Sequence, residues 1–280
     1  MKTASRCAAF RMKLREQLNL KNVYLQHVDK DVFVSSKWKC PTFYLCWRLF
    51  WALYHTSWLA GNLIVTSLDD DLSTAKWFIY LSNWVYLLLT VECVLELAVV
   101  VWEVYGRSNT YSGPHLPMLI KVMWLLYVMS VTGAVMVCIW YWTSVHKGRE
   151  ITAIRLNTHG VAALYILLNM VVTTIPLRVL HFVYPVIFGV SYTLFSAIYY
   201  SMDGTNQTGD RYIYSVLDWS RPDRTLALSS LSNFVFIPIV HLVLCAFNLG
   251  LDKLHQRFCP PAITHDQSLN SFDSEKQMMT

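Results

Sequence analysis

Ser82 and His159 are the residues of this chain whose types and expected positions suit nucleophilic catalysis. Ser82 lies near the start of one long apolar stretch and His159 opens a later one. At 1.5 Å per helical residue, Ser82 is expected about 8 Å below the membrane surface, a depth that His159 can share. An imidazole beside a hydroxyl can take its proton and create a nucleophile. Because serine and threonine also hydrogen-bond between packed membrane helices, a structural role stays open.

Asparagines stand beside both members of this pair, Asn83 next to the serine and Asn157 two residues before the histidine. A side-chain amide can donate a hydrogen bond to the oxyanion that forms during ester cleavage. The four residues together are therefore a candidate site for hydrolysis of a lipid ester.

Arg48 and Glu96 form a second candidate pair deeper in apolar sequence. Glu96 is expected about 9 Å from the inner end of its helix and Arg48 about 8 Å from the inner end of another. Since an unpaired charge in hydrocarbon is costly, these depths predict an ion pair, with Arg178 and His181 as neighbours. A proton or ion relay is the functional interpretation, and a structural pair with snorkelling side chains is the other.

The elements that must position these residues are membrane helices. Of the 280 residues, 55% are hydrophobic and 15% are charged, whereas soluble domains carry nearer a quarter charged residues. The stretch 76–102 has no charge between its first residue and Glu92, and is long enough to cross a bilayer. Its polar groups need partners from other helices. Six apolar segments are predicted to cross the membrane: 43–66, 77–102, 117–142, 159–175, 177–200 and 225–250.

Charge predicts the orientation of this all-α, polytopic bundle of six transmembrane helices. With a cytoplasmic N-terminus, 16 of the 23 basic residues lie on the cytoplasmic side, so both termini are expected there. The predicted regions are a basic tail (1–41), the six-helix domain (42–250) and a C-terminal tail expected to be disordered (251–280). The sequon at Asn206 then falls in the last outer loop, as a candidate glycosylation site. The aromatic stretch 212–219 of that loop is expected either to cap the helices or to lie in an interfacial belt.

Several classes of site find no support in the sequence. The net charge of +5 comes from basic residues gathered in the N-terminal tail, so nucleic-acid binding is not expected. No His, Cys and carboxylate spacing is typical of a metal site, and no glycine-rich phosphate loop is present. We therefore expect no metal and no cofactor.

The chain contains, in this order, the motifs KWFIYLSNW (76–84), NTHG (157–160), LHFVYP (180–185) and YIYSVLDW (212–219). Together they resemble the rolling stone family of insect and vertebrate multi-pass membrane proteins. That family is associated with myoblast fusion in flies. The resemblance implies a developmental protein acting at cell or vesicle membranes.

More distantly, the layout is similar to the androgen-induced and androgen-dependent transmembrane hydrolases, which cleave fatty-acid esters of hydroxy fatty acids. Those enzymes use an intramembrane threonine and a histidine at the head of a later helix. The matching positions are Ser82 and His159, with serine in place of threonine and different residues around the neighbouring tryptophan.

Three functions follow as hypotheses. The first is a role in cell or membrane fusion and differentiation, through membrane lipids or other membrane proteins. The second is an intramembrane lipid esterase that uses Ser82 and His159. The third is a transporter using Glu92, Glu96 and Arg48, although no pair of broken helices marks a midplane site. Each places the protein in the plasma membrane or an endomembrane.

Overall fold

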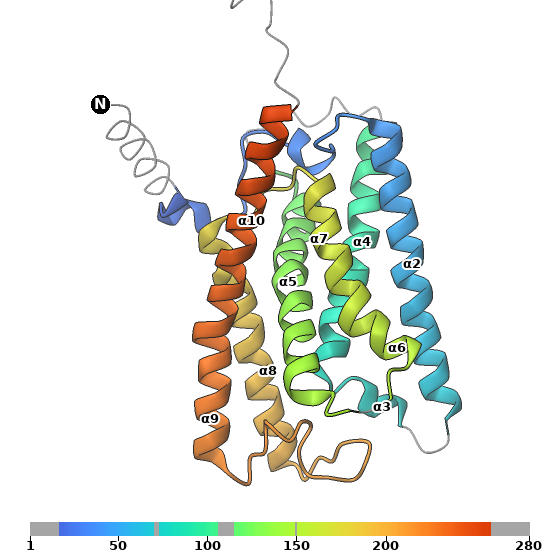
Figure 1. The fold of residues 1–280 in the computed structure, drawn as a ribbon, viewed down its shortest axis with the longest axis vertical. Helices are drawn as coiled ribbons and strands as arrows, with labels where there is room; N and C mark the ends of the chain where they lie inside the picture. The colour runs from blue at the N-terminus through green and yellow to red at the C-terminus, as the bar shows by residue number, and fades with distance from the viewer. Residues whose placement is uncertain (1–16, 70–72, 106–114, 149, 259–280) are drawn as a thin grey trace, which may run out of the picture.

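The computed structural model describes residues 17–69, 73–105, 115–148 and 150–258. Across these ranges the chain forms helices and no strand, with one isolated bridge between Ser36 and Thr173. The all-α fold class predicted from the sequence is confirmed. Six helical rods run along the long axis of the molecule (Figure 1). They are α2 (Pro41–Leu68), α4 (Leu81–Tyr105), α5 with η3 (Met118–Trp140 and Tyr141–Val145), α6 with η4 and α7 (Ala153–Leu156, Asn157–Val161 and Ala162–Val172), η5 with α8 (Val179–Phe182 and Val183–Ser201), and α9 with η6 and α10 (Pro222–Leu231, Ser232–Phe236 and Ile237–Phe258).

Four of these rods are long and apolar enough to cross a membrane. Their spans are Leu81–Glu103, Met118–Val145, Val179–Ser201 and Pro222–Phe258. Length and composition of this kind indicate an integral membrane protein. Six crossings with cytoplasmic termini stay a prediction.

Helix α2 has a polar buried face and an apolar outer face. Large apolar side chains such as Phe50, Leu53 and Ile64 are exposed. A helix of a soluble protein shows the reverse pattern, so the polar face of α2 must find its partners within the bundle. The buried residues recur at helical spacing: Tyr44, Arg48, Ala52, His55, Asn62 and Thr66.

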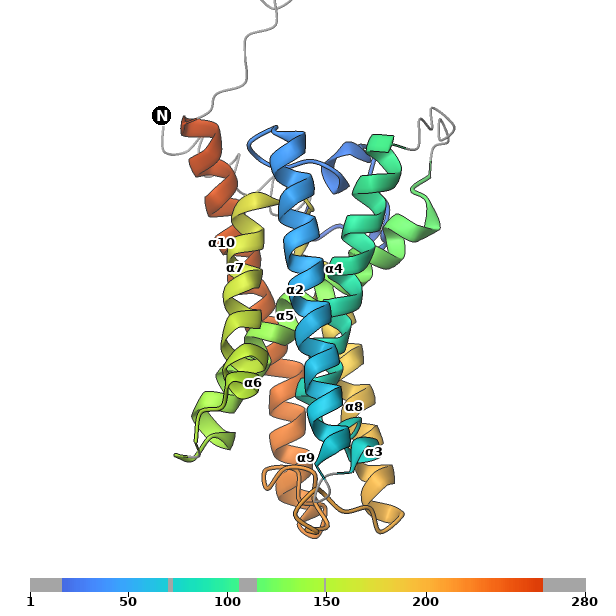
Figure 2. The same ribbon diagram turned by 90° about the vertical axis from the view of Figure 1, so that its right-hand side faces the viewer.

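Helix α5 lies at the centre of the bundle and packs against α4, α7, α8 and α10 (Figure 2). Its side chains Met123, Trp124, Tyr127, Val128 and Val131 have no exposed surface. Burial of these large side chains holds the surrounding rods in place, and those rods carry the polar residues discussed below.

The predicted helix 77–102 is divided in the structure. Trp77 ends a separate short helix, α3 (Thr74–Trp77), and α4 begins only at Leu81. The amide of Asn83 spans the break and donates to the Trp77 carbonyl over 2.7 Å. Ser82 therefore lies in the first turn of α4. His159 lies inside its rod, which begins at Ala153, rather than at its head.

The described part of the predicted basic tail, residues 17–40, packs on the bundle and is called the N-terminal cap here. It contains two short helices, η1 (Leu20–Val23) and η2 (Asp31–Phe33). Phe33 is 1% exposed, and its ring lies 4.9 Å from that of Trp124 on α5. The Lys37 ammonium pairs with Asp252 on α10 over 2.7 Å.

The described part of the predicted C-terminal tail, residues 251–258, continues α10 as helix. Residues 1–16 and 259–280 of the two predicted tails lie outside the described residues.

Candidate functional site

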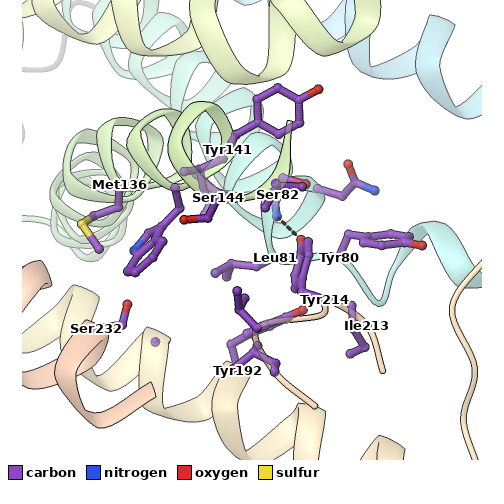
Figure 3. Close-up of a pocket in the computed structure, with 18 of the residues that line it drawn as sticks. Tyr80, Leu81, Ser82, Met136, Tyr141, Ser144, Tyr192, Ile213, Tyr214 and Ser232 are labelled. Atoms are coloured by element: carbon purple, nitrogen blue, oxygen red, sulfur yellow. Dashed lines mark hydrogen bonds between the residues drawn. The ribbon is translucent and has the colours of Figure 1, made fainter. Parts of the chain in front are cut away.

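A cavity of about 760 Å³ lies next to the loop 202–221 and extends between the helices. The loop is at the end of the bundle opposite the N-terminal cap (Figure 1). We call this loop the cavity loop. Ser82 at the start of α4 lines the cavity, and Figure 3 shows it beside Ser144, with Tyr192 of α8 below them. The walls mix aromatic and aliphatic side chains with hydroxyl and amide groups.

Three π-helical segments occur in the described residues, and each of them lines the cavity. Segment η3 contributes Tyr141 and Ser144, η4 contributes His159, and η6 contributes Ser232 and Asn233. π-turns inside α-helices are rare and occur frequently at functional sites. Their coincidence at one cavity marks this end of the bundle as the candidate site.

The aromatic stretch 212–219 lines the cavity through residues 212–217. Ile213 is buried, and the Tyr214 ring packs edge-on against Tyr80 with 5.7 Å between centroids. The Ser82 backbone N–H donates to the Tyr214 hydroxyl over 3.5 Å, a long hydrogen bond (Figure 3). Burial raises the pKa of Tyr214 to about 12, so its phenol stays protonated at neutral pH. Trp219 anchors the far end of the stretch by donating to the Ser196 hydroxyl over 3.1 Å.

Asn206 holds the cavity loop in shape. Its side-chain oxygen accepts from the Thr208 and Asp210 backbone N–H groups at 2.9 Å each, and its amide nitrogen donates to the Asp210 carboxylate over 3.1 Å. Hydrogen bonds from Thr208 and Asn206 lower the pKa of Asp210. Asp210 therefore stays ionised at neutral pH, and this contribution to the loop is lost only as the pH falls through that lowered value.

We expect Asn206 to carry no glycan in the folded protein. Asn206 is only 7% exposed. A glycan would have to replace a hydrogen on its side-chain nitrogen, which donates to the Asp210 carboxylate. Digestion with a glycosidase, followed by mass measurement of the peptide containing Asn206, checks this. A glycosylated peptide from well-folded protein would show that the cavity loop adopts another conformation.

The structure brings Ser82 and His159 to the same cavity. The imidazole is 9% exposed and stacks on Tyr141, with ring centroids 3.6 Å apart and planes 4° apart. Its Nδ1 is buried and has no hydrogen-bond partner in the structure. Among the hydrogen bonds of the described residues, none joins Ser82 to His159. The cavity therefore holds a hydroxyl and a free ring nitrogen without a direct bond between them.

The two asparagines occupy different places. Asn83 lines the cavity, although one of its amide hydrogens is committed to the Trp77 carbonyl. Asn157 is buried between α2 and α4, where it donates to Tyr86 over 2.7 Å and accepts from Tyr54 over 2.9 Å. Asn83 is thus the better placed of the two to face a ligand.

Arg48 and Glu96 lie in the other half of the bundle, nearer the N-terminal cap. The Arg48 guanidinium pairs with the Glu96 carboxylate, and both residues are 1% exposed. It also donates to Asn169 over 2.9 Å and to Thr173 over 3.1 Å, both at the end of the α7 rod, and to Tyr44 over 2.5 Å.

The predicted neighbours of this ion pair are elsewhere. Arg178 donates to the carbonyls of Tyr24 and Gln26 in the N-terminal cap, and the ring of His181 packs against Trp124. Sequence reasoning missed Asn169, whose one visible signal is an amide inside the apolar run of α7. As for metals, the described residues contain no group of three or more His, Cys, Asp or Glu side chains that could hold an ion.

Comparison with known proteins identifies relatives of this chain. A family model described as "Protein rolling stone" matches residues 5–264. The protein rolling stone of Drosophila melanogaster is 29% identical over 265 residues, which cover 89% of this chain and 92% of the fly protein. No solved structure matches the chain.

Proposed function

The chain belongs to the rolling stone family, and we propose that it acts in cell or membrane fusion during differentiation by binding lipid in its cavity. Two observations support this function. The family resemblance implies a role in fusion, and the cavity suits an amphipathic ligand. Loss of the protein should leave apposed cells unfused. Normal fusion in a knockout would remove the support for this role.

The proposed topology is six crossings with both termini in the cytoplasm. It rests on the excess of basic residues at the cytoplasmic side and on six successive rods that run back and forth between the two ends of the bundle (Figure 1). The cavity loop then faces the outside. In a background lacking the other cysteines, an impermeant thiol reagent should label an exposed Ser215→Cys in intact cells. It should reach the exposed Cys40 only after permeabilisation.

The chemistry of the cavity wall is the observation that supports lipid binding. A volume of about 760 Å³ falls in the range of small-molecule sites, which is roughly 300–1,000 Å³. Ser82, Asn83 and Asn233 offer hydrogen bonds, while Met129 and Met136 offer flexible apolar surface. A ligand with a polar group and an apolar chain satisfies both parts of such a wall, and membrane lipids have that form.

Filling the cavity is expected to remove the bound lipid. Ser144 lines the cavity on η3, so Ser144→Phe puts a ring into the space that a ligand needs. If the overpacking cost of about 1–3 kcal/mol falls on ligand binding, the affinity drops roughly 5- to 150-fold. Native mass spectrometry of the purified protein measures the retained lipid. The matched control is Thr143→Phe, because its neighbour Thr143 is exposed and does not line the cavity. Equal lipid retention in both variants would contradict the assignment.

A second candidate function is lipid-ester hydrolysis, favoured by one observation. Ser82 lines the same cavity as His159, whose buried Nδ1 has no hydrogen-bond partner in the structure. In this scheme the Ser82 hydroxyl attacks the ester carbonyl, His159 takes the hydroxyl proton, and Asn83 donates to the oxyanion. The histidine then returns the proton to the departing alcohol, and water hydrolyses the acyl-serine. The scheme requires the two side chains to come together when substrate binds.

A fluorophosphonate probe tests the esterase directly. An activated serine should be labelled in wild-type protein, and labelling should be lost in both Ser82→Ala and His159→Ala because nucleophile and base act as a unit. Ser144→Ala is the matched control, since it removes another hydroxyl from the same cavity. If well-folded wild-type protein takes no label, the esterase hypothesis is wrong and lipid binding without hydrolysis remains.

A further inference from the structure

Glu92 and Glu96 form a buried pair of carboxyl groups that the lipid cavity does not use. They lie one turn apart on α4, where side chains four residues apart are neighbours, and they are 0% and 1% exposed. Neither residue lines the cavity. An ionisable residue at this depth in a membrane protein is by default a candidate functional site.

The charges around this pair do not balance if both groups are ionised. The guanidinium of Arg48 is the cation beside them, and it pairs with Glu96. Two carboxylates and one guanidinium leave one negative charge in an interior that solvates charge poorly. The other titratable groups that face the pair are neutral hydroxyl and thiol groups. They are Tyr44 of α2, Cys93 of α4, Tyr127 of α5 and Tyr165 of α7.

The hydrogen bonds also indicate that the pair of carboxyl groups lacks one positive charge. Arg48 donates to Glu96 Oε2, and the Cys93 thiol lies 3.6 Å from Glu92 Oε2 as a weak donor. The second oxygen of each carboxyl group, Oε1, is buried and has no partner in the structure. Ionised carboxylates only accept hydrogen bonds, so the two groups can bond to each other only if one of them carries a proton.

We propose that Glu92 and Glu96 form a proton-binding site in which one proton is shared between the two carboxyl groups. The proton makes the cluster with Arg48 neutral and turns two adjacent acceptors into a hydrogen-bonded pair. A metal cation fits less well, because the guanidinium beside Glu96 repels it and the described residues supply no third acidic ligand. The site is separate from the lipid cavity and does not depend on the proposed function.

Infrared spectroscopy of the purified full-length protein at neutral pH tests the proposal. Wild type should show the carbonyl stretching band of an un-ionised carboxylic acid, amounting to one group per chain and shifting in D₂O. Glu92→Gln and Glu96→Gln should each lose the band, because Arg48 alone neutralises the carboxylate that remains. Glu103→Gln, on the same helix, is the matched control and should keep it.

Each outcome decides the question. A wild-type spectrum without the band would overturn the proposal, and thermal stability that then rose with sodium concentration would identify a sodium site. A band that persisted in both glutamine variants would also overturn the assignment by placing the proton elsewhere. The wild-type spectrum answers whether a proton is bound even if a variant fails to fold.

Discussion

Replacing Arg48 by methionine should cost about 3–5 kcal/mol of folding free energy, enough to leave little folded protein. The guanidinium is 1% exposed and satisfies Glu96, Asn169 and Thr173 at once. Methionine keeps the bulk of the side chain but leaves a buried carboxylate without its partner. The α7 rod also loses the two hydrogen bonds that Arg48 donates to Asn169 and Thr173.

Fluorescence-detected size-exclusion chromatography and the melting temperature in detergent measure this effect. Arg224→Met is the matched control, since Arg224 is exposed at the start of α9 and its loss should change little. The double variant Arg48→Met with Glu96→Gln should recover part of the stability, because it removes both charges together. An Arg48→Met protein as stable as wild type would mean that the ion pair is dispensable.

Phe33→Ala is expected to cost about 3–5 kcal/mol, the usual cost of deleting a buried phenylalanine ring. Phe33 belongs to a segment whose composition predicts a polar tail, yet it is 1% exposed and packs against Trp124. Removing the ring opens a cavity between the N-terminal cap and α5. The cap should then loosen, because Phe33 is its one buried large apolar side chain.

The melting temperature and the rate of proteolysis within residues 17–40 measure the result. Leu20→Ala serves as the control, since Leu20 lies in the same segment and is 77% exposed. If the two variants behave alike, the cap contributes nothing to stability and residues 17–40 act as a tail.

The helices themselves were predictable, because their apolar runs are long and interrupted by few charges. Pro41 and Pro222 mark two helix starts, where the missing backbone N–H has no helical partner to lose. The pairing of Arg48 with Glu96 also followed from helical rise alone, since two charges at equal depth in hydrocarbon have few other partners.

The N-terminal cap was not predictable from composition. Basic and polar residues dominate it, and what orders it is a small number of contacts with distant parts of the chain. Phe33 packs against Trp124, Lys37 pairs with Asp252, and the Tyr184 hydroxyl donates to the carbonyl of Val23 over 2.5 Å. Contacts between residues so far apart leave no periodic signal in the sequence.

By itself, the sequence determined that this chain is a helical membrane protein of the rolling stone family and that Ser82, His159, Arg48 and Glu96 are candidate functional residues. Hydrophobic length and charge are properties of single segments, so they can be read without knowing the fold. Only the tertiary structure decided that three π-turns meet at one cavity, that the cavity loop lines it, and that Asn169 joins the buried network. Those features depend on which helix faces meet, and that depends on the packing of all six rods at once.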